Sequence, residues 1–171
     1  METSLRLVHE ALLSTSARVP DKPALVAGGR SYAYGELLDS ARRLAGALKR
    51  GGVLPGDRVL LWLDNGFAAA ASIYAVWLAG GVVVTINPQT KRDKFHFIVR
   101  DCDATALIAE SRLLQSLAGD LEGLEGLRYV AETGDTGLYE NIGQLFEQEK
   151  LLANPQPVIA TDLAALIYTS G

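Results

Sequence analysis

Beyond residue 57, short apolar runs alternate with stretches of helical spacing along the 171-residue chain. The apolar runs predict strands at 58–63, 82–86, 105–109, 127–130 and 163–168. The intervening stretches predict helices at 67–79, 91–101 and 111–117, the last two capped by Thr90 and Ser111. Continuous apolar strands separated by helices indicate an α/β fold, with a mostly parallel sheet covered by helices on both faces.

The first fifty residues have a different pattern. A first helix ends before Pro20, and two strand-like halves around Gly28-Gly29 predict a small hairpin near residues 24–33. Apolar residues then repeat with helical spacing from Tyr34 to about Arg50, which predicts an amphipathic helix. These elements belong with the sheet, so we expect residues 1–171 to form a single unit.

Residues 132–160 are richer in turn formers, with "ETGDTG" and "NPQP". We expect a looser connection there, carrying one short helix over 142–149. The final predicted strand, 163–168, follows this connection.

Composition and charge exclude several classes of protein. With 49% hydrophobic and 21% charged residues, the chain has the composition of an ordinary globular domain. Sixteen basic and twenty acidic residues give a net charge of −4, and the basic residues are scattered. A nucleic-acid partner is therefore not expected, and a small-molecule ligand is the better hypothesis.

The uncharged stretch 65–90 is long enough to resemble a membrane span. However, Gly80-Gly81 interrupts it and a β-branched run follows, so helix, turn and buried strand fit better. The N-terminus carries Glu2, Arg6 and Glu10, where an export signal needs an apolar stretch. We therefore expect a cytoplasmic protein without a transmembrane segment.

Metal and thiol chemistry have little support in the sequence. Cys102 is the single cysteine, which excludes an internal disulfide, and its neighbours Asp101 and Asp103 disfavour the thiolate. His9 and His96 have no partner at a metal-ligand spacing. We expect no metal site in this chain.

The chain ends on "DLAALIYTSG", an apolar strand followed by Thr169, Ser170 and Gly171. In open parallel sheets, ligands bind beyond the carboxyl ends of the strands, where amides and hydroxyls can face phosphate oxygens. This pattern predicts a phosphate-binding turn at 169–171. Taken alone, the four letters "YTSG" favour an ordinary polar turn at the end of a strand.

Three stretches in order resemble the core motifs of the adenylate-forming enzymes, which include acyl- and aryl-CoA synthetases and peptide-synthetase adenylation domains. "SYAYGEL" (31–37) resembles T-Y-x-E-L, "WLAGGVVVTINP" (77–88) resembles K-A-G followed by a strand and N/D-P, and "DLAALIYTSG" (162–171) resembles the start of Y-T-S-G-T-T-G-x-P-K-G. "PDKPAL" (20–25) and "PGDRVLLWLDNG" (55–66) extend the resemblance over nearly the whole chain. The combination of order and spacing makes it specific.

The resemblance implies an ATP- and Mg²⁺-dependent ligase that forms an acyl adenylate from a carboxylic acid and transfers the acyl group to a thiol such as coenzyme A. It implies that 1–171 is the N-terminal portion of such an enzyme, whose phosphate-binding loop begins at Thr169, Ser170 and Gly171. The family's catalytic groups would lie beyond residue 171, so none is expected within this chain, and the 171-residue polypeptide itself is expected to be inactive.

A second reading is a non-catalytic α/β binding or interaction module with the same fold. In both readings, a sheet surface near 163–168 is expected to be uncovered, which predicts a homodimer through that surface.

Two departures from the motifs bear on these expectations. Ala33 occupies the helix-cap position where the first motif has Thr or Ser, while Glu36 is retained. Asn87-Pro88, rather than Asp-Pro, favours acyl- or aryl-CoA ligases over peptide-synthetase domains.

Overall fold

The computed structural model describes residues 7–117, 120 and 124–169. Among these residues, six strands form one sheet in the order β7-β6-β5-β3-β4-β8, and every pair of neighbours in it is parallel. The strands are β3 (Arg58–Trp62), β4 (Val82–Thr85), β5 (Ala104–Ala109), β6 (Tyr129–Glu132), β7 (Glu140–Asn141) and β8 (Ala165–Ile167).

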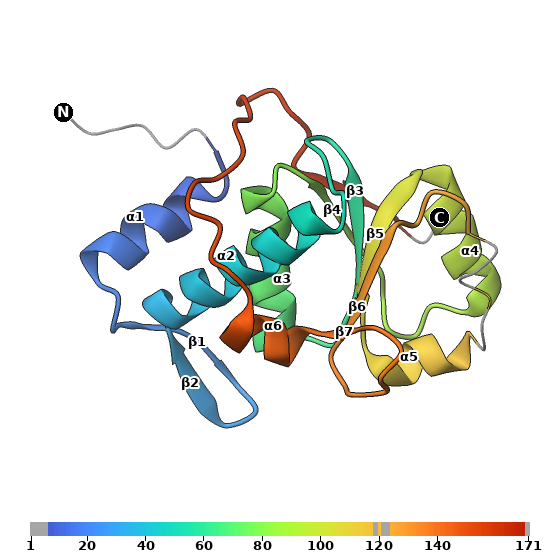
Figure 1. Cartoon of the computed structure of the whole chain (residues 1–171), viewed down its shortest axis with the longest axis horizontal. Helices are drawn as coiled ribbons and strands as arrows, with labels where there is room; N and C mark the ends of the chain where they lie inside the picture. The colour runs from blue at the N-terminus through green and yellow to red at the C-terminus, as the bar shows by residue number, and fades with distance from the viewer. Residues whose placement is uncertain (1–6, 118–119, 121–123, 170–171) are drawn as a thin grey trace.

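Helices cover both faces of this sheet, as Figure 1 shows. One face carries α1 (Glu10–Arg18), α2 (Tyr34–Arg50), α3 (Phe67–Leu78) and α6 (Ile142–Gln148), and the other carries α4 (Arg92–Asp101) and α5 (Ser111–Ser116). With right-handed crossovers, helices that connect strands in opposite directions across the sheet lie on opposite faces. Helices α3 and α6 connect to strands nearer the β8 edge, whereas α4 and α5 connect to strands nearer the β7 edge, which explains this division. The predicted fold class is confirmed.

Each face of the sheet has its own apolar core, because side chains alternate along a strand. Val59 and Leu61 of β3 pack with α2 and α3, whereas Leu60 and Trp62 pack with α4 and α5. Trp62 stacks on Phe95 of α4 with ring centroids 4.6 Å apart. The central strand β5 is buried at every position, which explains its continuous apolar sequence.

The predicted hairpin is present as β1 (Pro23–Ala27) and β2 (Arg30–Ala33), which pair in antiparallel fashion. Gly28 and Gly29 connect them with φ values of 57° and 77°, which are unfavourable for other residues.

Helix α3 has twelve residues. No helix in the described part of the chain combines the length and apolarity that a bilayer span requires.

Helix α2 begins where predicted, with Ala33 as its N-cap and no capping side chain. Backbone carbonyls replace the absent hydroxyl: the Tyr34 amide donates to Lys22 O at 3.0 Å and the Gly35 amide to Pro20 O at 2.8 Å. The entry to α2 is therefore satisfied by the segment before the hairpin.

Two predicted caps are wrong. Lys91, not Thr90, is the N-cap residue of α4, and Glu110 is that of α5, both without a capping side chain. Ser111 Oγ instead accepts a hydrogen bond of 2.7 Å from the Gly134 amide. The Ser111 hydroxyl therefore bonds to a residue distant in sequence instead of capping the helix.

The connection 132–160 contains more regular structure than predicted. Besides the expected helix, found as α6, it includes the two-residue strand β7. Strand β6 is also shifted two residues from the predicted 127–130, and ends on the fully buried Glu132.

Candidate functional site

Strand β8 leads directly into the predicted phosphate-binding turn. Tyr168 and Thr169 follow its last residue, Ile167, and Thr169 is exposed. Ser170 and Gly171 lie outside the described residues. The structure thus places Thr169 at the carboxyl ends of the strands, the end of the sheet where parallel sheets bind ligands.

Strand β8 lies beside β4, so two motifs far apart in sequence become neighbours. Val83, Val84 and Thr85 pair with Ala165, Leu166 and Ile167. Both strands run in the same direction, and therefore the "NP" turn after β4 and the Tyr168-Thr169 segment after β8 leave the sheet at the same end, the carboxyl end of the strands. This juxtaposition provides the geometry that a shared ligand site needs.

The turn after β4 is fixed by side-chain and backbone hydrogen bonds. Trp62 Nε1 donates to Asn87 O at 3.1 Å, and Asn87 Oδ1 accepts from the Gln89 amide at 2.8 Å. The Ile86 amide donates to Leu61 O at 2.9 Å. These hydrogen bonds hold the turn after β4 in place, at the same end of the sheet as Thr169.

A polar cluster joins the carboxyl ends of β3, β5 and β6. Glu110 accepts from Thr133 Oγ1 at 2.5 Å and from the Asp64 amide at 3.2 Å, while Arg112 pairs with Asp64 at 2.7 Å. Arg112 is thus engaged with a carboxylate rather than free to meet a phosphate. This cluster was not predicted from the sequence, although acidic residues directly after predicted strands could have indicated it.

Glu132 is a fully buried carboxylate at the end of β6. Its Oε1 accepts from the amide and hydroxyl of Thr136, at 2.8 and 2.6 Å. Its Oε2 has no hydrogen-bond partner within the described part of the chain. The paired oxygen anchors the loop that follows β6.

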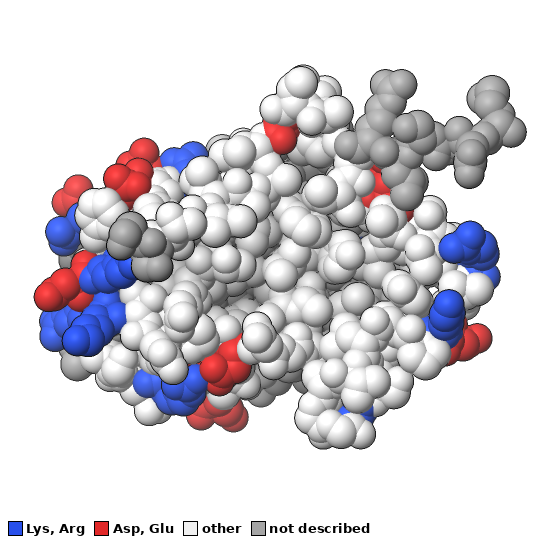
Figure 2. Space-filling view, turned by 180° about the vertical axis from the view of Figure 1, so that it is seen from behind, with Lys and Arg blue, Asp and Glu red and all other residues white. Residues whose placement is uncertain are grey.

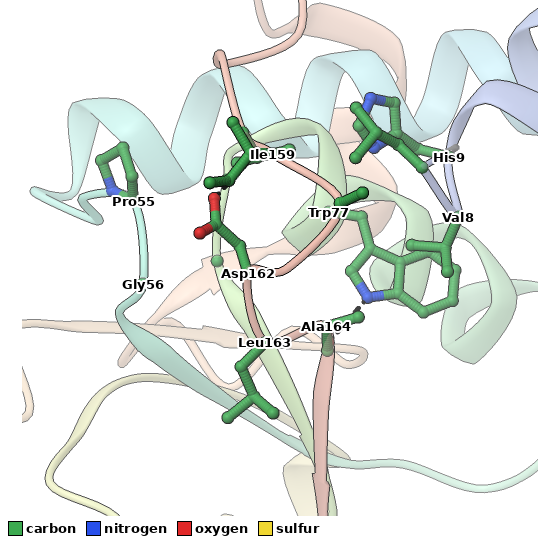
Figure 3. Close-up of a pocket in the computed structure, with 14 residues that line it drawn as sticks. Val8, His9, Pro55, Gly56, Trp77, Ile159, Asp162, Leu163 and Ala164 are labelled. Atoms are coloured by element: carbon green, nitrogen blue, oxygen red, sulfur yellow. Dashed lines mark hydrogen bonds between the residues drawn. The ribbon is translucent and has the colours of Figure 1, made fainter. Parts of the chain in front are cut away.

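A cavity of about 330 Å³ lies at the opposite end of the sheet, at the amino ends of β3, β4 and β8. Figure 3 shows Val8, Trp77, Ile159 and Leu163 around it. Trp77 Nε1 donates to Ala164 O at 2.8 Å. Apolar side chains and the polar His9 and Asp162 line the cavity, which lies apart from the predicted turn.

The histidine and cysteine side chains have shifted pKa values because of burial. Burial lowers the pKa of His9, which keeps the imidazole neutral near pH 7, and burial raises the pKa of the Cys102 thiol. Within residues 7–117, 120 and 124–169, no three His, Cys, Asp or Glu side chains converge as metal ligands would.

Known proteins match this chain along most of its length. The AMP-binding enzyme family matches residues 12–171. N-(5-amino-5-carboxypentanoyl)-L-cysteinyl-D-valine synthase of Penicillium rubens is 33% identical over 167 residues, which are 96% of this chain and 4% of that protein.

Solved structures agree with this similarity. A benzoate CoA ligase from Burkholderia xenovorans aligns with a TM-score of 0.82 and 25% identity, over 92% of this chain and 31% of the ligase. The nonribosomal peptide synthetase FmoA3 in its AMPPNP-bound form aligns with a TM-score of 0.80 and 27% identity, over 99% of this chain and 17% of the synthetase. The chain therefore spans a small part of each of these much longer proteins.

Proposed function

Because this chain belongs to the AMP-binding enzyme family, we propose that its protein activates a carboxylic acid with ATP. The carboxylate attacks the α-phosphate, which gives an acyl adenylate and releases pyrophosphate, and a thiol then accepts the acyl group. The observation that carries this proposal is the pairing of β4 with β8, which brings the "NP" turn and Thr169 to the same carboxyl end of the sheet.

Within this chain, the proposed role is to begin the phosphate-binding loop. The hydroxyl and amide of the exposed Thr169 are donors suited to phosphate oxygens, and we propose the same role for Ser170 and Gly171. Mg²⁺ would arrive with ATP, because the described residues offer no cluster of acidic ligands near Thr169. The 171-residue polypeptide alone is proposed to be inactive, since it holds only three residues of the loop.

Two thiol acceptors each have an observation in their favour. Asn87-Pro88 and the similarity to a benzoate CoA ligase favour coenzyme A, which is our first proposal. The 33% identity to a peptide synthetase favours a carrier-protein thiol. We propose a cytoplasmic location, where ATP and coenzyme A are available.

The test is ATP–pyrophosphate exchange with the longest polypeptide that the gene encodes, over a panel of aryl, fatty and amino acids. We expect exchange with at least one acid, and thioester formation when coenzyme A is added. Thioester formation only with a phosphopantetheinyl carrier protein would favour the second acceptor. A folded protein that gives no exchange with any acid would instead support a non-catalytic binding module.

Thr169→Val in that polypeptide should reduce exchange about tenfold or more, because an oxygen donor to phosphate is lost. Thr161→Val is the matched control, since Thr161 is also exposed but lies before β8. Equal activity of the two variants would contradict the role of Thr169. For the 171-residue polypeptide, ATP–pyrophosphate exchange with any carboxylic acid would contradict its proposed inactivity.

A further inference from the structure

Trp62, the last residue of β3, connects three segments at the carboxyl ends of the strands. Its indole Nε1 donates to Asn87 O at 3.1 Å, in the turn after β4. Its own carbonyl accepts from the Glu110 amide at 3.0 Å, directly after β5. Trp62 is 1% exposed, so the turn supplies the acceptor that this buried N–H group needs. Trp62 therefore ties the turn after β4 to the middle of the sheet.

The other hydrogen bonds of this turn lie within it. Asn87 O also accepts from the Thr90 amide at 2.8 Å, and Asn87 Oδ1 accepts from the Gln89 amide at 2.8 Å. These two bonds fix the shape of the turn but not its position relative to the sheet. Asn87 and Gln89 are exposed, so burial of their side chains adds little. The bond from Trp62 Nε1 supplies a link from the turn to the sheet.

Helix α4 holds the indole ring from its other side. Trp62 stacks on Phe95 with the ring planes 21° apart, and Phe95 is fully buried. The residues before it, Arg92, Asp93 and Lys94, are exposed. Figure 2 shows the densest group of charged side chains at the side of the molecule that carries α4 and α5 in Figure 1. An amphipathic helix of this kind has one favourable orientation on a sheet, which fixes the indole and the direction of its N–H group.

The register of β4 and β8 relates this turn to the predicted phosphate-binding segment. Thr85 pairs with Ile167, so Asn87 and Thr169 each lie two residues beyond the same pair. Neighbouring strands are about 4.8 Å apart, and the two segments therefore leave the sheet side by side. The position of one segment then bears on the position of the other.

We propose that Trp62 is a positioning residue for adenylation, an inference that rests on the proposed function. Because Trp62 is buried, it acts through the turn rather than on a substrate. Its N–H group holds the Asn87 carbonyl, and the turn in turn supports the segment that begins at Thr169. A shift of that segment by about 1 Å would slow the chemical step, because attack on the α-phosphate needs closely aligned groups.

The second tryptophan provides a matched control. Trp77 Nε1 also donates to a backbone carbonyl, Ala164 O at 2.8 Å, but at the amino ends of the strands. Trp62→Phe and Trp77→Phe each keep an aromatic ring and lose one indole N–H group. In ATP–pyrophosphate exchange by the longest polypeptide that the gene encodes, we expect kcat to fall at least about fivefold for Trp62→Phe, with the KM for ATP changed less than about twofold. We expect both constants to stay within about twofold for Trp77→Phe. Equal kcat values for the two variants, or an effect of Trp62→Phe confined to KM, would overturn the positioning role.

Asn87→Ala tests the same turn from its exposed side. It removes the acceptor of the Gln89 amide and leaves the buried Trp62 in place, so it should fold even where Trp62→Phe does not. Urea denaturation checks that each variant is folded. We expect kcat to fall at least about threefold, and an unchanged kcat would overturn the role of the turn.

Amide hydrogen exchange separates this inference from the proposed function. Relative to the amides of β5, which report global opening, we expect the Gln89 and Thr90 amides to exchange at least about tenfold faster in Trp62→Phe than in Trp77→Phe. Equal exchange would overturn the hold of Trp62 on the turn, whether or not the protein is active. A loosened turn in an unmodified background that gives no pyrophosphate exchange with any acid would overturn the proposed function, and with it the role in adenylation.

Discussion

The two edges of the sheet are built in different ways. At one edge, β7 has two residues: Glu140 accepts from Tyr129 Oη at 2.5 Å and pairs with Arg50 at 3.1 Å, and Asn141 accepts from the Gln144 amide at the start of α6. At the other edge, β8 carries no charged residue, and Ile167 is 76% exposed. Substitutions at the β7 edge should therefore lower the free energy of unfolding more than substitutions at the β8 edge.

Gly51→Ala should have the largest effect on the β7 edge. A Cβ at this position would lie 2.9 Å from Tyr129 Cβ and closer still to the Tyr129 ring. We expect a loss of about 2 kcal/mol in the free energy of unfolding, measured by urea denaturation. Gly66→Ala is the control, because its added Cβ meets nothing within 4 Å and affects only the start of α3. Equal losses in the two variants would contradict the tight contact at Gly51.

Two tyrosine hydroxyls allow the edges to be compared directly. Tyr129 is buried and donates to Glu140, whereas Tyr168, next to β8, donates to Asp101 at 2.5 Å in an exposed position. Tyr129→Phe should lower the free energy of unfolding by about 1 kcal/mol, because the buried Tyr129 loses its hydrogen bond to Glu140. Tyr168→Phe should cost less than about 0.5 kcal/mol. Similar losses would show that the β7 edge is no better secured than β8.

Alkaline pH should weaken the β7 edge through the same residue. Burial, together with the hydrogen bond to Glu140, raises the pKa of Tyr129, so the folded state keeps this proton after the unfolded state has lost it. The free energy of unfolding should therefore fall as the pH rises above about 10, by up to about 1.4 kcal/mol per pH unit for one group. Urea denaturation between pH 9 and 11 should show a shallower decline for Tyr129→Phe than for the unmodified chain.

The ion pair of Arg50 with Glu149 should have the smallest effect. Its N···O distance is 2.6 Å, and Arg50 also pairs with Glu140; because Arg50 is half exposed, Arg50→Met should cost only about 0.5 kcal/mol at pH 7 although it removes both pairs. The hydrogen bond from Arg50 lowers the pKa of Glu149, and the pair stabilises the fold above the ordinary glutamate value near 4.3. That contribution is lost as the pH falls through the lowered pKa. The difference between Arg50→Met and the unmodified chain should therefore shrink as the pH falls below the ordinary glutamate value; a difference that stays constant with pH would point to packing.

The sequence predicted the elements whose neighbours are local or uniformly apolar. The strand at 105–109 was recognisable because every residue of β5 is buried. β7 was not recognisable, because two polar residues make no apolar pattern and their partner Arg50 is distant in sequence. Likewise, the end of β6 depends on Glu132, whose burial requires Thr136 as a hydrogen-bond donor.

In the candidate site, too, the local pattern was predictable and the contacts between distant segments were not. The strand-to-turn pattern placed Thr169 at the carboxyl end of β8, while Ser170 and Gly171 lie outside the described residues and keep their roles as predictions. The cluster of Asp64, Glu110 and Arg112 was missed, since it forms only when the ends of β3 and β5 come together.

The order of strands has a consequence for how the chain folds. Strand β8 closes onto β4 only after α4, β5, α5, β6, β7 and α6 have been traversed, so this pairing closes a long loop and comes at a high entropic cost. Its three residues pair only with β4 within the described part of the chain, which offers little to offset this cost. We expect β8 to dock late during folding and to open first in the native state, so that its amide hydrogens exchange sooner than those of β3. The segment that leads into the predicted site is thus also the part of the sheet that is easiest to release.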